Sequence, residues 1–518
     1  MARHLARTFG LTVYGIEGSL VEVEVDISTG LPSFDVVGLP DAAVREARER
    51  VRSAIRNSGF EFPVRRITVS LAPAGRRKEG PGLDLPIALG ILAAAGEVPA
   101  GAAAAWAGLG ELALDGAVRP VRGALAMAIA ARRAGRRQLL VAPDSAGEAA
   151  LAAGLSVHGV PSLRAAVTAV SGRNVPPPAV PATAGEAAGG GAGDEADLTD
   201  VRGMDGARRA LEVAAAGAHN LLLIGPPGTG KTMLSRRLPG ILPPLAGEEA
   251  LDVTMIHGIA GLLPPGAGLV AARPFRAPHH CASSAALVGG GRPPRPGEVT
   301  LAHHGVLFLD ELAEFRRESL EALRTPLEDG QVTVSRLNSA AVFPAAFMLV
   351  AAMNPCPCGW LGDPVRPCRC SPDEVERYRG RISGPLLDRI DVVVEVRRPA
   401  YAELAQPRAA PNTSSAAVRA RVAAARRLQH ARASAAGIVA PRPNATLAAR
   451  EVERLCQPDA AGERLLAAAF DRLGLSPRAR ERILKVARTI ADLDGAQTVG
   501  AAHVAEAIQY RALDRGRP

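Results

Sequence analysis

The stretch GPPGTGKT, residues 225–232, decides how the central part of this chain folds. It fits the pattern G-x-x-x-x-G-K-[ST], in which a glycine-rich loop between a strand and a helix binds phosphate groups through its backbone N–H groups. The flanks agree, because the apolar run at 221–224 predicts a buried strand and residues 233–238 can begin a helix. The residues expected to contact a nucleotide are Gly225, Pro226, Pro227, Gly228, Thr229, Gly230, Lys231 and Thr232.

Lysine is rare in this chain, which makes its position informative. Only Lys78, Lys231 and Lys485 are lysines among the 61 basic residues. Lys231 stands where the pattern needs a compact ammonium group, which reaches between the β- and γ-phosphates where a broad guanidinium would not fit. This supports a phosphate-binding loop over a simple Gly/Pro-rich turn.

Two later apolar runs also end in polar residues. Residues 306–309 (VLFL) lead directly to Asp310 and Glu311, and residues 347–353 lead to Asn354. In an open parallel sheet, ligands bind outside the carboxyl ends of the strands, so these polar residues should converge with the loop on one nucleotide. The pattern predicts an α/β domain built on a parallel sheet.

Each of these residues has an expected role in nucleotide hydrolysis. Lys231 neutralises the β- and γ-phosphate oxygens, while the Thr232 hydroxyl and the Asp310 carboxylate hold Mg²⁺. Glu311 polarises the attacking water, and Asn354 holds that water or the γ-phosphate. We therefore expect ATP and Mg²⁺ as cofactors and ATP hydrolysis as the reaction.

Length and composition predict several domains. A chain of 518 residues is too long for one core, so two to four domains are expected. The segment 175–196 is rich in Pro, Gly and Ala, which predicts a flexible linker between a first domain at 1–174 and a nucleotide-binding domain at 197–400. The remainder, 401–518, has helical periodicity, with a helix predicted at 479–493, and is expected to form a helical lid that moves with nucleotide state.

The first domain is expected to mix strands and helices. Apolar and acidic residues alternate over 21–27, which predicts a strand with one buried face. Similar patterns predict strands at 67–71 and 138–141 and helices at 41–57 and 121–134.

This order of elements, with the segments 77–84 and 120–135, resembles the Lon-type protease domain, which implies an α+β fold. By that resemblance the serine nucleophile falls on Gly82, and the lysine base falls on Leu125 or Met127. None of these residues can act as a nucleophile or a base. We therefore expect a catalytically inactive scaffold or binding surface and not a protease.

The central region resembles the AAA+ ATPases, and more closely their magnesium-chelatase-like branch. The matching stretches are GPPGTGKT, VLFLDEL, MNPCPCG and SGPLLDRID, the last at 383–391. With the Lon-like first domain included, the resemblance covers nearly the whole chain and is closest to the YifB/ComM family. It implies a homo-hexameric DNA helicase that promotes branch migration during natural transformation.

The resemblance also implies roles for two arginines. Arg389 is expected to be an arginine finger that reaches the nucleotide of the neighbouring subunit, and Arg478 a second sensor on the helical lid. The chain contains 58 arginines beside its three lysines, so an ordinary surface ion pair is the alternative for both.

Basic loops in the central region could contact a polyanion. Residues 273–280 and 289–298 are basic and rich in Pro and Gly, and residues 328–334 predict a turn that opens a hairpin. In related motors such hairpins line a ring's pore, where basic loops would track a phosphate backbone. The formal net charge of +9 also favours a polyanionic partner, although solvated loops are the alternative.

Four cysteines within fifteen positions predict a metal site. Their spacing is C-x-C, nine residues, then C-x-C, which is tighter than the usual C-x₂₋₄-C spacing of zinc sites. Four thiolates can close a tetrahedral structural zinc site, and a reduced metal-free loop is the alternative. The expected zinc ligands are Cys356, Cys358, Cys368 and Cys370.

The preferred function is an ATP-driven motor on single-stranded or branched DNA. An ATP-driven protein remodeller like the magnesium chelatase motor subunits is the alternative, and a regulatory ATP switch is a third possibility. No secretory signal or apolar stretch of about 20 residues is found, so a cytoplasmic protein without a membrane segment is expected.

Overall fold

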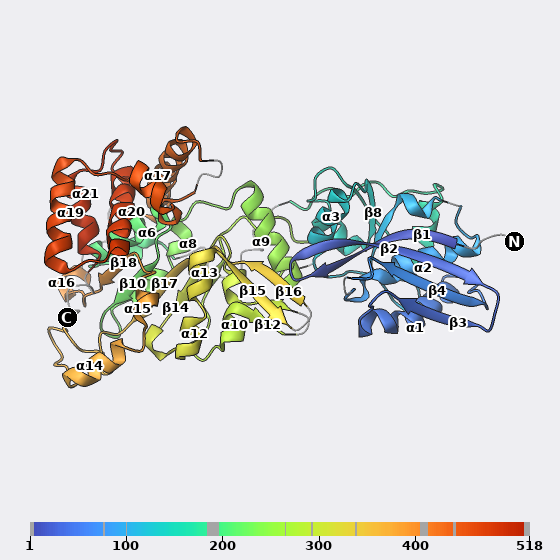
Figure 1. The fold of residues 1–518 in the computed structure, drawn as a ribbon, viewed down its shortest axis with the longest axis horizontal. Coiled ribbons are helices and arrows are strands. Elements are labelled where there is room, and N and C mark those ends of the chain that lie inside the picture. Colours follow the sequence, from blue (N-terminus) through green and yellow to red (C-terminus); the bar gives the residue numbers. More distant parts are fainter. Residues whose placement is uncertain are drawn as a thin grey trace.

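The computed structural model describes residues 5–75, 78–99, 101–183, 196–264, 266–291, 294–336, 339–404, 413–438 and 442–511. They form two lobes arranged along the long axis of the molecule (Figure 1). The first lobe ends with residue 183, and the second contains the phosphate-binding loop and the C-terminal helices.

A seven-stranded mixed sheet forms the first lobe, in the order β3-β4-β2-β1-β5-β8-β9. β2 pairs antiparallel with both β1 and β4, and the other neighbours pair in parallel. The strands expected at 21–27, 67–71 and 138–141 are confirmed. The sheet comprises β1 (Leu5–Tyr14), β2 (Glu17–Ser28), β3 (Ser33–Val37), β4 (Arg66–Ala72), β5 (Ala107–Leu109), β8 (Gln138–Val141) and β9 (Ser156–Gly159).

The helices predicted at 41–57 and 121–134 are confirmed as α1 (Ala42–Asn57) and α3 (Ala124–Arg133), and three further α-helices of the described residues also belong to this lobe. α1 begins after Asp41, whose carboxylate accepts a hydrogen bond from the Val44 backbone at 2.8 Å. α2 (Asp84–Ala95) is apolar on all sides because it is buried, which explains the apolar run there. The remaining helices are α4 (Pro143–Ala149) and α5 (Leu163–Val170).

The described part of the expected linker lies along the first lobe. Ala179 N–H donates to Val157 O at 2.7 Å, and Ala182 N–H donates to Gly147 O at 3.1 Å. These bonds hold residues 175–183 in place, whereas 184–195 lie outside the described residues. The domain boundaries stay predictions.

Among the described residues, contacts between the lobes include two between elements that Figure 1 shows side by side. Helix α3 packs against α9 (Gly247–Ala260), whose Leu251 and Met255 lie against the core of the first lobe. The turn between β1 and β2 places Tyr14 and Ile16 on the core beneath the hairpin of β15 (Gln331–Arg336) and β16 (Ser339–Pro344).

A five-stranded, fully parallel sheet forms the centre of the second lobe, in the order β11-β14-β17-β10-β18. The strand predicted at 221–224 is β10, and those predicted at 306–309 and 347–353 are β14 and β17. Their near-continuous burial accounts for the apolar runs in the sequence. The strands are β10 (Leu221–Ile224), β11 (Phe275–Arg276), β14 (Val306–Leu309), β17 (Met348–Met353) and β18 (Val392–Glu395).

The hairpin expected near 328–334 exists, but its turn lies elsewhere. Helix α13 (Arg324–Asp329) ends at Gly330, whose φ of +65° is typical of a helix C-terminus. The two strands of the hairpin are instead joined at 337–338, outside the described residues. The predicted position of the turn was therefore wrong, because a glycine that ends a helix and a glycine in a turn give the same local signal in the sequence.

The C-terminal helices share one hydrophobic core with the central sheet. Residues from α20 (Pro477–Leu493), which confirms the helix predicted at 479–493, pack in the same cluster as residues of β10 and α6 (Asp205–Gly217). The other main helices are α17 (Ser415–Ala435), α19 (Ala460–Leu473) and α21 (Ala501–Gln509).

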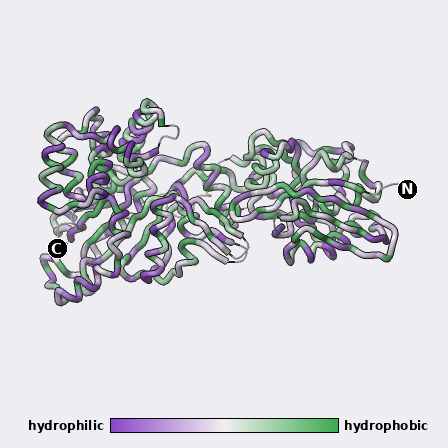
Figure 2. Tube along the Cα trace, in the orientation of Figure 1, coloured by the Kyte–Doolittle hydropathy of each residue, from purple (hydrophilic) through white to green (hydrophobic). Residues whose placement is uncertain are grey.

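Hydrophobic and hydrophilic residues alternate along both lobes (Figure 2). Among the described residues, no helix combines the length and the apolar character that a membrane span requires.

Candidate nucleotide site

Three strand ends bring the expected nucleotide residues together. Because β10, β14 and β17 run parallel, the segments that follow them leave the sheet at one edge. There the Nζ of Lys231 donates to Oδ1 of Asn354 at 3.3 Å, and Oγ1 of Thr232 donates to Oδ2 of Asp310 at 2.6 Å. The convergence expected from the sequence is thus present in the fold.

The phosphate-binding loop is shaped by glycines and by its lysine. Gly228 and Gly230 have φ angles of +75° and +88°, which a side chain would strain. The Nζ of Lys231 donates to the carbonyl oxygens of Gly225 at 2.6 Å and Pro226 at 2.9 Å. Burial lowers the pKa of Lys231 to about 8, although Asp310 and Glu311 act in the opposite direction.

The residues at this edge fit Mg²⁺ and a triphosphate. A hydroxyl in contact with a carboxylate, as in Thr232 and Asp310, is the oxygen pair that Mg²⁺ takes beside phosphate oxygens. The buried ammonium of Lys231 is satisfied only by neutral oxygens, so it favours an anion beside it. These three side chains would hold the metal and the phosphates.

Glu311 lies at the same edge, beside a histidine that sequence reasoning missed. The Glu311 backbone has φ +53°, and its carboxylate is more than half exposed. Oε2 of Glu311 lies 3.5 Å from Nδ1 of His280, which follows β11. Because a strand of two residues leaves no periodic pattern to recognise, no local signal predicts this contact of His280.

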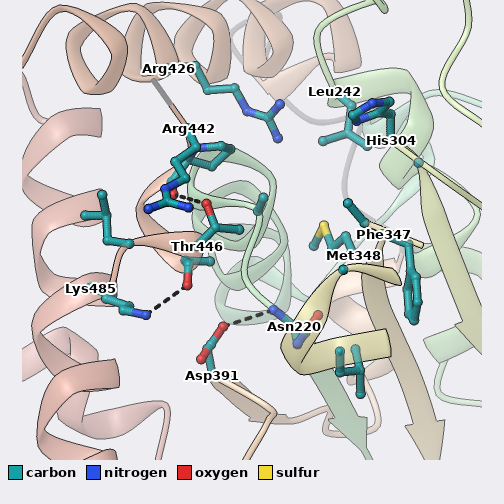
Figure 3. Close-up of a pocket in the computed structure, with 18 of the residues that line it drawn as sticks. Asn220, Leu242, His304, Phe347, Met348, Asp391, Arg426, Arg442, Thr446 and Lys485 are labelled. Carbon is teal, nitrogen blue, oxygen red and sulfur yellow. Dashed lines mark hydrogen bonds between the residues drawn. The ribbon is translucent and has the colours of Figure 1, made fainter. Parts of the chain in front are cut away.

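Arg389 and Arg478 do not join this group. Both line a cavity of about 1360 Å³ between the sheet and the C-terminal helices. Asn220, Met348 and Asp391, which precede β10, β17 and β18 or begin them, line the same cavity (Figure 3). The cavity therefore lies at the amino edge of the sheet, roughly 13 Å from the carboxyl edge for a strand of four residues.

Basic side chains outnumber acidic ones in the lining of this cavity. Arg389 donates to the Pro385 carbonyl at 2.7 Å and forms an ion pair with Glu328. Arg478 lies in the first turn of α20 and is exposed. Further basic residues that line the cavity are Arg273, Arg426, Arg427, Arg442, Arg482 and Lys485.

The arginines of the loop at 273–280 form hydrogen bonds and ion pairs with other residues of the same chain. Arg273 donates to Glu249 at 2.7 Å and to two backbone carbonyls, and Arg276 forms a two-point contact with Glu298 at 2.6 and 2.9 Å. Their acidic partners are 24 and 22 residues away and leave no local signal, and the expectation that this loop lines a pore stays a prediction.

The four clustered cysteines converge. Their sulfur atoms lie within 4.8 Å of one another, and all four are free thiols. Backbone N–H groups of Arg369 and Trp360 lower the pKa of Cys358 to about 6, which favours the thiolate. A set of four thiols with one thiolate already favoured is chemically suited to zinc.

The Lon-like positions of the first lobe carry no reactive group. Gly82, Leu125 and Met127 are all buried. The only nearby lysine in the described chain, Lys78, is buried with its Nζ bonded to the carbonyl oxygens of Gly38 and Pro73.

The chain is similar to known proteins over nearly its whole length. Residues 197–404 match the family model described as magnesium chelatase, subunit ChlI, and residues 23–145 and 412–511 match further ChlI models, the latter for its C-terminal part. The uncharacterized protein YifB of Salmonella typhimurium is 46% identical over 97% of this chain and 96% of its own length. Competence protein ComM of Haemophilus influenzae is 44% identical over 99% and 98%. A magnesium-chelatase 67 kDa subunit of Chlorobaculum tepidum is 30% identical over 30% of this chain and 23% of its own length.

Proposed function

The chain belongs to the YifB/ComM family of magnesium-chelatase-like proteins, and on that premise we propose that it is an ATP-hydrolysing motor that works on DNA as a homo-hexameric ring. The observation that carries the proposal is the placement of two groups at opposite edges of one sheet. Lys231, Thr232 and Asp310 lie at the carboxyl edge, and Arg389 and Arg478 lie at the amino edge. In a ring, the two arginines of one copy can lie against the nucleotide residues of the next copy.

Within each subunit, the residues have distinct parts in hydrolysis. Lys231 binds the phosphate oxygens, and Thr232 with Asp310 holds Mg²⁺, which would neutralise charge on the phosphates. Glu311 accepts a proton from the attacking water, and Asn354 orients that water. Arg389 of the neighbouring subunit supplies the positive charge that stabilises the transferred phosphoryl group in the transition state.

The positive charge of the chain and its similarity to one relative support DNA as the substrate. The chain has a formal charge of +9, and a relative at 44% identity is named a competence protein. We propose that the motor drives branch migration of DNA during recombination or transformation. An ATP-driven protein remodeller is the second candidate, because all three matched family models describe a magnesium chelatase subunit.

Three further points belong to this proposal. The first lobe keeps a Lon-protease-like fold and acts as a binding scaffold without protease chemistry, in keeping with its apolar residues at the reactive positions. The cysteine cluster holds a structural Zn²⁺. The protein acts in the cytoplasm, where such thiols stay reduced.

Three-strand branch migration with the purified protein, MgATP and a Lys231→Ala control tests the DNA function. We expect single-stranded or branched DNA to stimulate ATP hydrolysis and the wild type alone to move the branch. If DNA neither binds nor stimulates hydrolysis, the DNA motor is excluded and the protein remodeller becomes the working hypothesis.

A further inference from the structure

We infer that zinc bound by Cys356, Cys358, Cys368 and Cys370 holds Asn354 in place, so that zinc occupancy sets the rate of ATP hydrolysis. The inference rests on the proposed ATPase function and adds a regulatory metal to it. The four cysteines and the segment between them, residues 356–370, are called the zinc loop below.

The spacing of the thiols fits a tetrahedral site. Cys356 Sγ lies 3.4 Å from Cys358 Sγ and 3.6 Å from Cys368 Sγ, and the latter two lie 3.6 Å apart. Zinc–sulfur bonds of about 2.3 Å in a tetrahedron place sulfur atoms about 3.8 Å apart. The Cys358 and Cys370 backbone N–H groups donate to cluster sulfur atoms at 3.4 Å, as expected around thiolates.

The zinc loop has almost no other source of stability. No residue from 360 to 371 is buried, and the segment contains no helix or strand. Inside the loop, the Arg366 guanidinium lies over the Trp360 ring, 4.5 Å from the centroid, and Asp363 Oδ1 accepts hydrogen bonds from the Val365 and Arg366 backbone N–H groups at 2.8 Å. A loop with so little apolar burial requires a cross-link, which bound zinc supplies.

The loop begins two residues after Asn354 and is tied to the nucleotide site. Gly359 has φ +83° and packs so closely on Pro227 of the phosphate-binding loop that a Cβ at Gly359 would lie 2.7 Å from its ring. At the C-terminal end of the zinc loop, α14 (Pro372–Arg379) begins two residues after Cys370. Burial raises the pKa of its Tyr378, and the nearby Asn354 backbone acts in the opposite direction.

Asn354 is therefore held between the zinc loop and α14. Arg379 reinforces this arrangement by donating to the Pro355 carbonyl at 3.4 Å. If the loop loses its metal, the backbone after Asn354 loses its fixed end, and the side chain no longer stays aligned with Lys231. The consequence is a lower kcat with little change in nucleotide binding, because Lys231 and Thr232 remain.

Metal content is the first measurement. The purified full chain should contain about one zinc per chain, and Co²⁺ in its place should give the absorption bands of tetrahedral thiolate coordination. Cys368→Ser and Cys370→Ser should lose the metal. Val365→Ser, an exposed change in the same loop, and Cys456→Ala, outside the cluster, should keep it. A wild type without zinc that shows no Co²⁺ bands overturns the inference.

A double-mutant cycle tests the action through Asn354. Cys368→Ser should lower kcat about ten-fold and leave the affinity for MgADP within about two-fold. In an Asn354→Ala background the same change should cost almost nothing more, because the residue through which zinc acts is gone. Full additivity, or an unchanged kcat after loss of zinc, overturns the inference.

Trp360 gives a readout that does not need turnover. In a Trp106→Phe background it is the only tryptophan, and it adjoins Gly359 on Pro227. Its fluorescence should respond to MgADP with zinc bound and not without it; a response that is the same in both overturns the inference. If the wild type binds nucleotide without hydrolysing it, the proposed function is refuted. The Trp360 fluorescence response to MgADP still decides whether zinc couples the loop to the nucleotide site.

Discussion

Lys231 illustrates how a single residue's surroundings set a measurable property. Its ammonium group is buried and bonded to the Gly225 and Pro226 carbonyls and the Asn354 amide oxygen, all of them neutral. Burial therefore lowers its pKa from 10.5 to about 8 in the nucleotide-free chain. Phosphate oxygens favour the charged form, so bound nucleotide raises this pKa again.

It follows that nucleotide affinity depends on pH above 8. Between pH 8 and the higher pKa of the complex, binding must be accompanied by uptake of a proton by Lys231. The affinity for MgADP should then fall by up to about ten-fold per pH unit above pH 8 and be nearly constant below it. Equilibrium binding at pH 7, 8 and 9 measures this. Lys231→Arg, which stays charged, should bind MgADP more weakly but without the decrease in affinity above pH 8. If this variant keeps the decrease, the pH dependence belongs to another group.

Glu311 is expected to act only in the chemical step. Its carboxylate is exposed, and the ion pair that it forms among the described residues is with His280 and not with the phosphate-binding loop. Glu311→Gln should lower kcat by about 10²- to 10⁴-fold and leave MgATP affinity nearly unchanged. Steady-state hydrolysis and equilibrium binding measure the two effects. Glu318→Gln, an exposed change seven positions later, should alter neither, and equal losses in both variants would reject the role.

Residue roles could be predicted from sequence only where spacing along the chain encodes them. Asp310 and Asn354 each follow a short apolar run directly, so the strand-end rule finds them, and the spacing of GPPGTGKT finds Lys231. His280 follows a two-residue strand and is found only in three dimensions. The partners of Arg273 and Arg276 are likewise set by folding, because any of many carboxylates could pair with them.

At the level of elements, the contact between α20 and the central sheet depends on buried polar groups. His219, which precedes β10, contacts Oγ1 of Thr489 at 2.8 Å and Oδ2 of Asp391 at 3.3 Å. Asn444 connects Thr489 to Asp492 with bonds of 3.0 and 2.9 Å. The helical region is thus fixed to the sheet by a network and not only by apolar packing, which limits how freely it moves as a lid.

Asp492 should be the most sensitive member of this network. It accepts hydrogen bonds from Arg432 at 2.6 and 2.7 Å and from Arg488 at 3.1 Å, and it is 3% exposed. Asp492→Ala leaves both guanidinium groups without their carboxylate and should lower the free energy of unfolding of the second lobe by about 3–5 kcal/mol. Urea denaturation followed by circular dichroism measures it. Asp494→Ala, a surface change, should cost about 1 kcal/mol or less, and equal costs would contradict the network.

Elements were predictable where periodicity and local signals suffice. The strands at 21–27 and 221–224 and the helix at 479–493 have patterns of burial that appear directly in the sequence. The turn of the β15–β16 hairpin was misplaced because Gly330 ends a helix. Nor could local patterns predict that this hairpin contacts Tyr14 and Ile16, since that contact depends on how two lobes meet.

At the level of the whole molecule, the two edges of the central sheet need different partners. Lys231 and Glu311 lie at the carboxyl edge, and Arg389 lines the cavity at the amino edge. A four-residue strand separates these edges by roughly 13 Å, so Arg389 cannot reach the nucleotide of its own chain without unfolding the sheet. A finger role requires the neighbouring copy in a head-to-tail ring.

Mixing two inactive variants tests this directly. Lys231→Ala lacks a phosphate site but keeps its finger, and Arg389→Ala lacks the finger but keeps its site, so a mixed interface of the right order is complete. Random mixing in equal amounts should restore about one quarter of wild-type ATP hydrolysis. Lys231→Ala mixed with Glu311→Gln should restore none, because both act in the same site. If subunits exchange, as shown with labelled protein, and hydrolysis does not return, Arg389 acts within its own chain or only in its ion pair with Glu328.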